Sequence, residues 1–105
     1  HKAREQELRI QQAENNSRDL NEKMILETEQ ALLNVHEAYA LVALADSTLL
    51  DAASNLEDIQ THYAAGLVPI SEVLEAQTLY QSAQDRRTEA RIDYRLKCAR
   101  LKNIQ

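Results

Sequence analysis

The sequence has few of the residues that interrupt helices. Its 105 residues include one Gly, one Pro, four Tyr and no Phe or Trp. The two strong breakers, Gly66 and Pro69, stand in one short segment. A β-sandwich or an α/β domain needs many turns, and turns use Gly and Pro, so both fold classes are excluded. The remaining residues, rich in Ala, Leu, Glu, Gln and Arg, favour helix.

The clusters that most catalytic and metal sites require are also missing. A single cysteine, Cys98, excludes an intrachain disulfide framework and a zinc cluster. His36 and His62 are too far apart on one helix to share a metal ion. No arrangement of Ser, His and Asp at catalytic spacing can be argued. The sequence therefore predicts no enzyme, no metal site and no cofactor.

Long hydrophobic runs are absent as well. No apolar stretch reaches the roughly 18–20 residues of a transmembrane helix, so we expect this segment to lie outside the bilayer. The given residues show no signal-peptide pattern and do not begin with Met. We therefore expect it to be a segment of a longer protein.

Positive charge is missing from the middle of the chain. Residues 24–85 carry ten acids and no Lys or Arg, whereas residues 86–105 carry seven basic and two acidic side chains. This distribution indicates either a field that attracts cations or a solvated acidic helix surface. Nucleic acid is not an expected partner, because the basic block also carries acids and matches no nucleic-acid-binding motif.

Apolar residues recur every seven positions in both halves of the chain. The spacing alternates between four and three, which is typical of the seam of a coiled coil. Arg87 and Lys97 interrupt the second half, but their long stems can lie along a seam with the charge outside. We expect the seam to be formed by Ala31, Val35, Ala38, Val42, Ala45, Leu49, Ala52, Leu56, Ile59, Tyr63, Val73, Ala76, Tyr80, Ala83, Arg87, Ala90, Tyr94, Lys97, Leu101 and Ile104.

A turn separates the two heptad runs. Gly66 can adopt φ > 0 just past a helix end, and the fixed φ of Pro69 suits a first helical turn. We predict a first helix over 1–65, a tip turn over 66–68 and a second helix over 69–105. So short a connection makes the helices antiparallel, with residue i opposite about residue 135 − i. The predicted fold is all-α, a long antiparallel coiled-coil helical hairpin.

The antiparallel pairing leaves the first part of the long helix without a partner. His1–Gln30 is polar, with only scattered apolar side chains. A second, weaker apolar stripe of Leu33, Ala40 and Leu44 lies off the main seam. We expect further helices, from the rest of the protein or from other copies, to complete the packing, and the chain alone to self-associate through this second stripe.

The segment around the turn resembles the TolC-like outer-membrane efflux proteins. The residues that carry the resemblance run from His62 to Tyr80, HYAAGLVPISEVLEAQTLY, and continue with the ARIDY segment that ends at Tyr94. The shared pattern is Tyr-x-x-Gly-Leu, a short gap, an acid, Val-Leu, an acid, Ala and, later, Ala-Arg-x-x-Tyr. The chain is similar to the second of the two internal repeats of these proteins.

The resemblance implies a place in a larger assembly. The parent protein would be a homotrimer of the outer membrane with a long α-helical tunnel through the periplasm. This chain would be one periplasmic hairpin, a fragment of the trimeric α-barrel. Its tip would meet a membrane-fusion adaptor that bridges to an inner-membrane transporter. The assembly would export drugs, metals or proteins and catalyse no reaction.

The resemblance also implies roles for the tip residues. Gly66 and Leu67 match the motif that docks the adaptor, with Ala65 where the family has Val. Glu72 and Glu75 match an acid pair that rings the tunnel constriction. Their structural alternative is stabilisation of the second helix through its dipole, since both fall in its opening turns.

Two further residues match positions that bond neighbouring hairpins to each other and hold the tip closed. These are Tyr63 and Arg91, although heptad spacing also assigns Tyr63 to the seam. Two other functions stay open. The hairpin of an adaptor would carry an Arg-x-x-x-Leu signature at its tip, which is absent here. An unrelated structural coiled-coil scaffold would leave the tip acids facing solvent.

Overall fold

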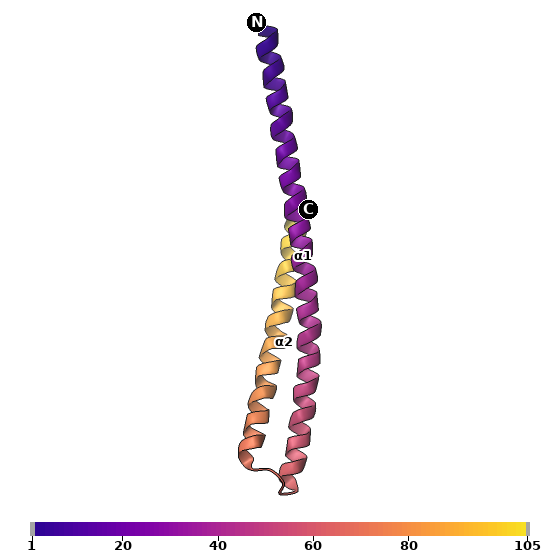
Figure 1. The fold of residues 1–105 in the computed structure, drawn as a ribbon, viewed down its shortest axis with the longest axis vertical. Coiled ribbons are helices and arrows are strands. Elements are labelled where there is room, and N and C mark those ends of the chain that lie inside the picture. The colour runs from indigo at the N-terminus through magenta and orange to yellow at the C-terminus, as the bar shows by residue number, and fades with distance from the viewer. Residues whose placement is uncertain (1, 105) are drawn as a thin grey trace.

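The computed structural model describes residues 2–104, which form two helices joined by a short turn. Helix α1 spans Lys2–Ala64, and helix α2, Ile70–Ile104, returns along it (Figure 1). No β-strand occurs between residues 2 and 104. The predicted all-α antiparallel hairpin is therefore confirmed. His1 and Gln105, which the predicted helices included, lie outside the described residues.

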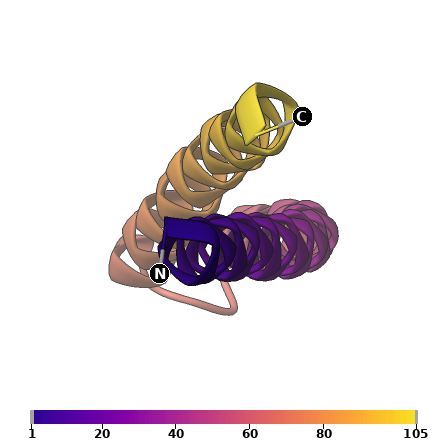
Figure 2. The same cartoon turned by 90° about the horizontal axis from the view of Figure 1, so that it is seen from above.

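The molecule is a thin rod whose principal dimensions are 96 × 17 × 14 Å. The 63 residues of α1 account for this length at about 1.5 Å per residue. The first part of α1 extends well past the end of α2 (Figure 1), and the two helix axes are inclined to each other (Figure 2). The rod therefore consists of a paired hairpin and an unpaired helical extension.

The two helices meet along the predicted heptad seam. Small residues dominate its most buried positions, which lets two helix axes approach closely. Arg87 and Lys97 are half-buried, and the charged group of each forms an ion pair. Of the predicted seam positions only Tyr63 is exposed. The buried residues among 2–104 are Ala31, Ala38, Val73, Ala76 and Ala83.

Tyr63 corrects the seam prediction. It is 46% exposed, although its heptad position is the same as that of half-buried Leu56 and Leu49. By the register Tyr63 faces only the first turn of α2, which begins at Ile70, and no further seam residue packs beyond it toward the tip. A heptad position is buried only where a partner helix covers it.

Contacts between the helices confirm the expected register. Asp46 was expected opposite residue 89, and it lies between Arg87 and Arg91, accepting hydrogen bonds from both. The ring of Tyr39 contacts that of Tyr94 edge to face, with centroids 5.7 Å apart. Such aromatic pairs add stabilisation beyond the area they bury.

Helix α1 ends in a Schellman motif. The N–H of Gly66 donates to the carbonyl of Tyr63 at 2.9 Å, and the N–H of Leu67 donates to the carbonyl of His62 at 2.8 Å. These two bonds satisfy carbonyls that a helix C-terminus otherwise leaves without partners. The motif requires a left-handed residue, and Gly66 provides it with φ of 76°.

Helix α2 begins directly after Pro69. The carbonyl of Pro69 accepts a 3.1 Å hydrogen bond from the N–H of Glu72, which starts the first turn. The connection between the helices therefore runs from Ala65 to Pro69, one residue longer at each end than predicted. It places residues 66–68 at one extreme of the rod.

Candidate functional site

The predicted docking residues lie at the exposed tip of the hairpin. Leu67 is 72% exposed, and a Cβ built on Gly66 would meet no atom within 4 Å. Ile70 and Tyr63 are also half-exposed beside the turn. The tip therefore presents an open surface with apolar side chains, supported by a hydrogen-bonded turn.

The predicted acid pair lies on the opening turns of α2. Glu72 falls in the first turn, and Glu75 follows three residues later on the same face of the helix. Both side chains are exposed, and neither forms an ion pair within residues 2–104. The carboxylates are therefore free to interact with a helix dipole, a cation or another copy of the chain.

The structure does not bring Tyr63 and Arg91 together. Tyr63 lies in the last turn of α1, whereas Arg91 lies some 21 residues into α2, roughly 30 Å along the helix. The guanidinium of Arg91 is bonded within the hairpin, where its Nη2 lies 3.3 Å from Oδ1 of Asp46. Their predicted role between neighbouring hairpins stays a prediction.

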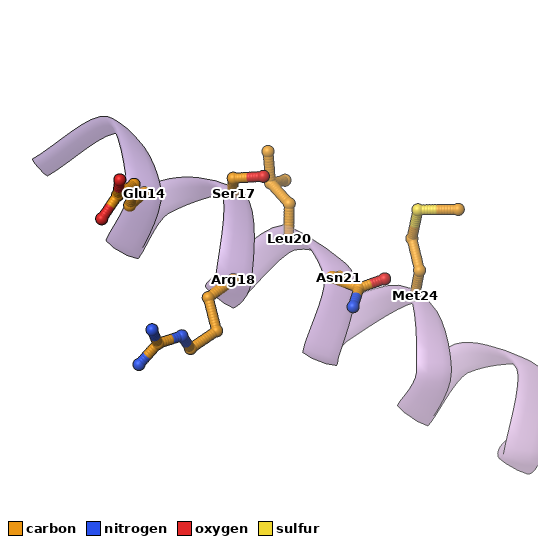
Figure 3. A pocket seen from close by; sticks show the side chains of 6 residues that line it. All are labelled: Glu14, Ser17, Arg18, Leu20, Asn21 and Met24. Carbon is orange, nitrogen blue, oxygen red and sulfur yellow. The ribbon is translucent and has the colours of Figure 1, made fainter. Parts of the chain in front are cut away.

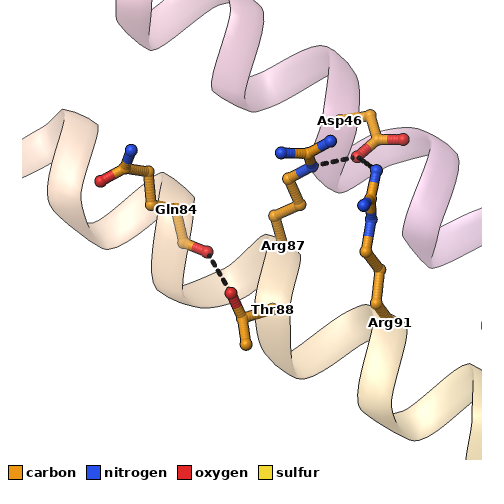
Figure 4. A network of polar contacts seen from close by, with 5 residues as sticks. All are labelled: Asp46, Gln84, Arg87, Thr88 and Arg91. Carbon is orange, nitrogen blue, oxygen red and sulfur yellow. Dashed lines mark hydrogen bonds and ion pairs between the residues drawn. The ribbon is translucent and has the colours of Figure 1, made fainter.

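Asp46 is the centre of the polar contacts between the helices (Figure 4). Its Oδ1 accepts hydrogen bonds from Nε of Arg87 at 2.8 Å and from Nη2 of Arg91. The hydrogen bond from Arg87 and the charges of both arginines hold the pKa of Asp46 below its usual value. Sequence reasoning counted Asp46 only as one of ten acids; the signal that identifies it is the register, which sets it between two arginines.

A second cross-helix cluster lies about one heptad farther from the tip. Tyr94 packs against Tyr39, and Cys98 stands one turn after Tyr94 on α2. Hydrogen bonding with the Cys98 side chain, together with the nearby Tyr39, raises the pKa of Tyr94 above its ordinary value. The raised pKa keeps the Tyr94 hydroxyl neutral beside the half-buried Cys98 side chain.

The surface hollows of the rod are shallow. The hollow drawn in Figure 3 is lined by side chains from one stretch of α1, with no second element to enclose it. Ligand pockets are concave and bury most of their ligand, which a single helix cannot do. Within residues 2–104, no group of three His, Cys, Asp or Glu side chains is placed to hold a metal ion. The residues that line the hollow in Figure 3 are Glu14, Ser17, Arg18, Leu20, Asn21 and Met24.

The charge of the rod changes sign along its length. Beyond Asp46 toward the tip, residues 47–85 carry six acids and no Lys or Arg. None of these six acids forms an ion pair in the part of the chain that the structure describes. The tip half is therefore an uncompensated negative surface, and the basic residues lie on the opposite half of α2.

Comparison with protein-family models, with curated protein sequences and with solved structures finds no match for the chain. Neither described helix contains a stretch that is both apolar and long enough to cross a bilayer. The features of the hairpin that bear on function are its length, its exposed tip and the acids that form no ion pair among residues 2–104.

Proposed function

We propose that the chain is a periplasmic tunnel hairpin of a TolC-like outer-membrane efflux or secretion channel. In this proposal the parent protein is a homotrimer, and the tip around Gly66 and Leu67 docks a membrane-fusion adaptor that reaches an inner-membrane transporter. Glu72 and Glu75 line the entrance constriction. The hairpin acts as a conduit and carries out no reaction.

The exposed tip is the observation that carries this proposal. A coiled-coil hairpin that served only as a spacer would also need a turn with a left-handed glycine, but it would have no need for an exposed leucine on that turn. Here the Schellman bonds fix the turn while Leu67 stays 72% exposed. An apolar side chain on a rigid support suits docking, because little conformational entropy is lost on binding.

The unpaired acids support the second part of the proposal. Three copies of Glu72 and Glu75 around one axis would bring six carboxylates to the entrance. Their combined field would attract cations into the constriction and repel anions. Glu has a side chain one methylene longer than Asp, so each charge would reach farther into the entrance than an Asp at the same position.

The adaptor hairpin is the less favoured alternative. Its tip would be expected to carry Arg, whereas residues 24–85 of this chain contain neither Arg nor Lys. An unrelated scaffold is less favoured as well, because it assigns no partner to the exposed Leu67 or to the acids that follow it.

Block of the channel by cations tests the proposal. The parent channel is reconstituted in planar bilayers, and its conductance is measured with a multivalent cation on the tip side. Replacing both acids, Glu72→Ala with Glu75→Ala, is expected to weaken block at least about tenfold, because removing the carboxylates removes most of the attraction.

The matched control removes two acids far from the tip, Glu27→Ala with Glu29→Ala. This double replacement changes the net charge by the same amount as the Glu72 and Glu75 replacement, and it is expected to leave cation block of the channel unchanged. Equal block in the wild type and in the Glu72 and Glu75 variant would contradict a constriction at these residues. A parent protein that forms no channel would contradict the whole proposal.

A further inference from the structure

The ion pair between Asp46 and Arg91 identifies one side of the hairpin. Residues seven apart in a coiled coil share a face, so Leu32 and Tyr39, which precede Asp46 by 14 and 7 residues, lie on this side. Ile70 precedes Arg91 by 21 residues and lies on it too. We call this surface the Asp46 side.

Two leucines extend the Asp46 side. Leu50 follows Asp46 by four residues and Leu74 follows Ile70 by four, which keeps each on the same helix face. Leu50 is 72% exposed and Leu74 is 56% exposed. The Asp46 side therefore carries exposed apolar residues at three levels of the rod. Ile70 and Leu74 lie near the tip, Leu50 lies in the middle, and Leu32 and Tyr39 lie farthest from the tip.

We propose that a second copy of the chain docks on the Asp46 side in the antiparallel direction, with the two-fold axis at Leu50. Leu32 and Tyr39 stand 18 and 11 residues before Leu50. By the hairpin register, Ile70 and Leu74 lie at the levels of residues 65 and 61 of α1, on the other side of Leu50. The axis thus brings the tip residues of each copy opposite Leu32 and Tyr39 of the other, as a closed two-fold contact requires.

Charge complementarity favours the antiparallel direction. The tip half of the hairpin is acidic, and residues 86–105 of α2 carry a net charge of +5 from seven basic and two acidic side chains. On the Asp46 side, Arg95 follows Arg91 by four residues, and Glu57 follows Leu50 by seven. The antiparallel pairing sets Arg95 of one copy near Glu57 of the other, whereas a parallel pairing sets like charges side by side.

The contact area of the proposed dimer reaches the size of a standard specific interface. The pairing overlaps about 32 residues of α1 in each copy, roughly 50 Å of rod. A strip of that length on a rod 17 Å wide covers on the order of 800 Å² per copy, which is the size of a standard specific interface. The proposal concerns the 105-residue chain and does not depend on the tunnel proposed above, in which neighbouring hairpins point the same way.

Analytical ultracentrifugation of the full chain at low salt, with reductant to keep Cys98 free, tests the proposal. The wild type is expected to sediment as a dimer. Leu50→Glu places two carboxylates together at the axis and is expected to raise the dissociation constant at least about tenfold. Circular dichroism of each variant checks that the hairpin is intact, which is expected because Leu50 makes little contact within one chain.

The control is an exposed leucine on the opposite side. Leu44 is 62% exposed and lines a shallow groove there with Arg86 and Asp93. The Asp46 side thereby replaces the second stripe of Leu33, Ala40 and Leu44 as the expected surface of self-association, and Leu44→Glu is expected to leave the dissociation constant unchanged. An equal effect of the two leucine variants would overturn the assignment of the Asp46 side.

A charge swap tests the direction of pairing. Arg95→Glu alone and Glu57→Arg alone are each expected to weaken the dimer about tenfold, because two symmetric pairs become repulsive. The double variant restores opposite charges across an antiparallel interface and is expected to return the wild-type dissociation constant. A failure of the double variant to recover, a wild-type trimer, or a wild-type monomer at high concentration would overturn the proposal.

Discussion

At the scale of single residues, Asp46 reinforces the seam alignment that the short connection between the helices sets. The seam repeats every seven residues with Ala at many positions, so a slip by one heptad still matches small against large residues. Such a slip would move Asp46 from Arg87 and Arg91 to positions near Tyr80 and Gln84, or near Tyr94 and Cys98. Only the observed register lets one carboxylate bond two guanidinium groups.

Asp46→Asn is expected to lower the stability of the hairpin at neutral pH. The folded-state pKa of Asp46 is below the usual value of an aspartate, so the carboxylate contributes fully above that usual value and loses its contribution as pH falls through the lowered pKa. The difference in unfolding midpoint between wild type and variant is therefore expected to be constant from pH 7 to about pH 5 and to disappear in stronger acid. Thermal unfolding followed by circular dichroism measures it.

Asp51→Asn is the matched control for this change. Asp51 is exposed and forms no ion pair among residues 2–104, so its replacement is expected to leave the midpoint nearly unaltered. Added salt is also expected to narrow the gap between the wild type and Asp46→Asn, since exposed ion pairs are screened. A gap that grows below pH 4 would contradict the role given to Asp46.

At the scale of structural elements, the turn depends on the backbone of one residue. Gly66 has φ of 76°, a left-handed conformation that residues with a Cβ rarely adopt. A Cβ at this position would meet no atom within 4 Å. The cost of Gly66→Ala is therefore conformational and is expected to be about 1–2 kcal/mol of unfolding free energy. Urea unfolding at equal chain concentration measures it.

Gly66→Asn separates this cause from any steric effect. Asn is the larger side chain, but it visits the left-handed region more readily than Ala. The Asn variant is therefore expected to be more stable than the Ala variant. The reverse order would indicate crowding at the tip and would contradict the open environment of Gly66.

The elements themselves could be predicted because their causes are local. Heptad spacing, the scarcity of breakers and the pairing of Gly66 with Pro69 suffice to predict two helices, the seam and the direction reversal. The exposure of Tyr63 could not be predicted, because heptad spacing does not show where the partner helix stops covering the seam. The bonds of Asp46 could be predicted only by combining the register with the charges of Arg87 and Arg91. The roles of the predicted tip residues stay predictions, because no contact among residues 2–104 tests them.

At the scale of the whole molecule, the rod has two parts with different sources of stability. Residues 31–64 of α1 pack against α2, whereas residues 2–27 are exposed on every face. A lone helix in water has little stability, because nucleation is costly and no apolar face is buried. The helical extension therefore contributes length but little to the folding of the hairpin.

Deleting residues 1–23 is expected to leave the hairpin intact. The seam, the Asp46 bonds and the turn all lie beyond the deletion, so the urea midpoint at equal chain concentration is expected to match that of the full chain. The dissociation constant of the dimer is also expected to match that of the full chain, because the antiparallel pairing uses α1 only from about residue 32 onward. Amide hydrogen exchange of the full chain supplies the independent measurement: residues 2–27 are expected to exchange much faster than residues 38–56. Strong protection of residues 2–27, or loss of the dimer on deletion, would show that a partner covers the extension and would move the docking surface away from Leu50.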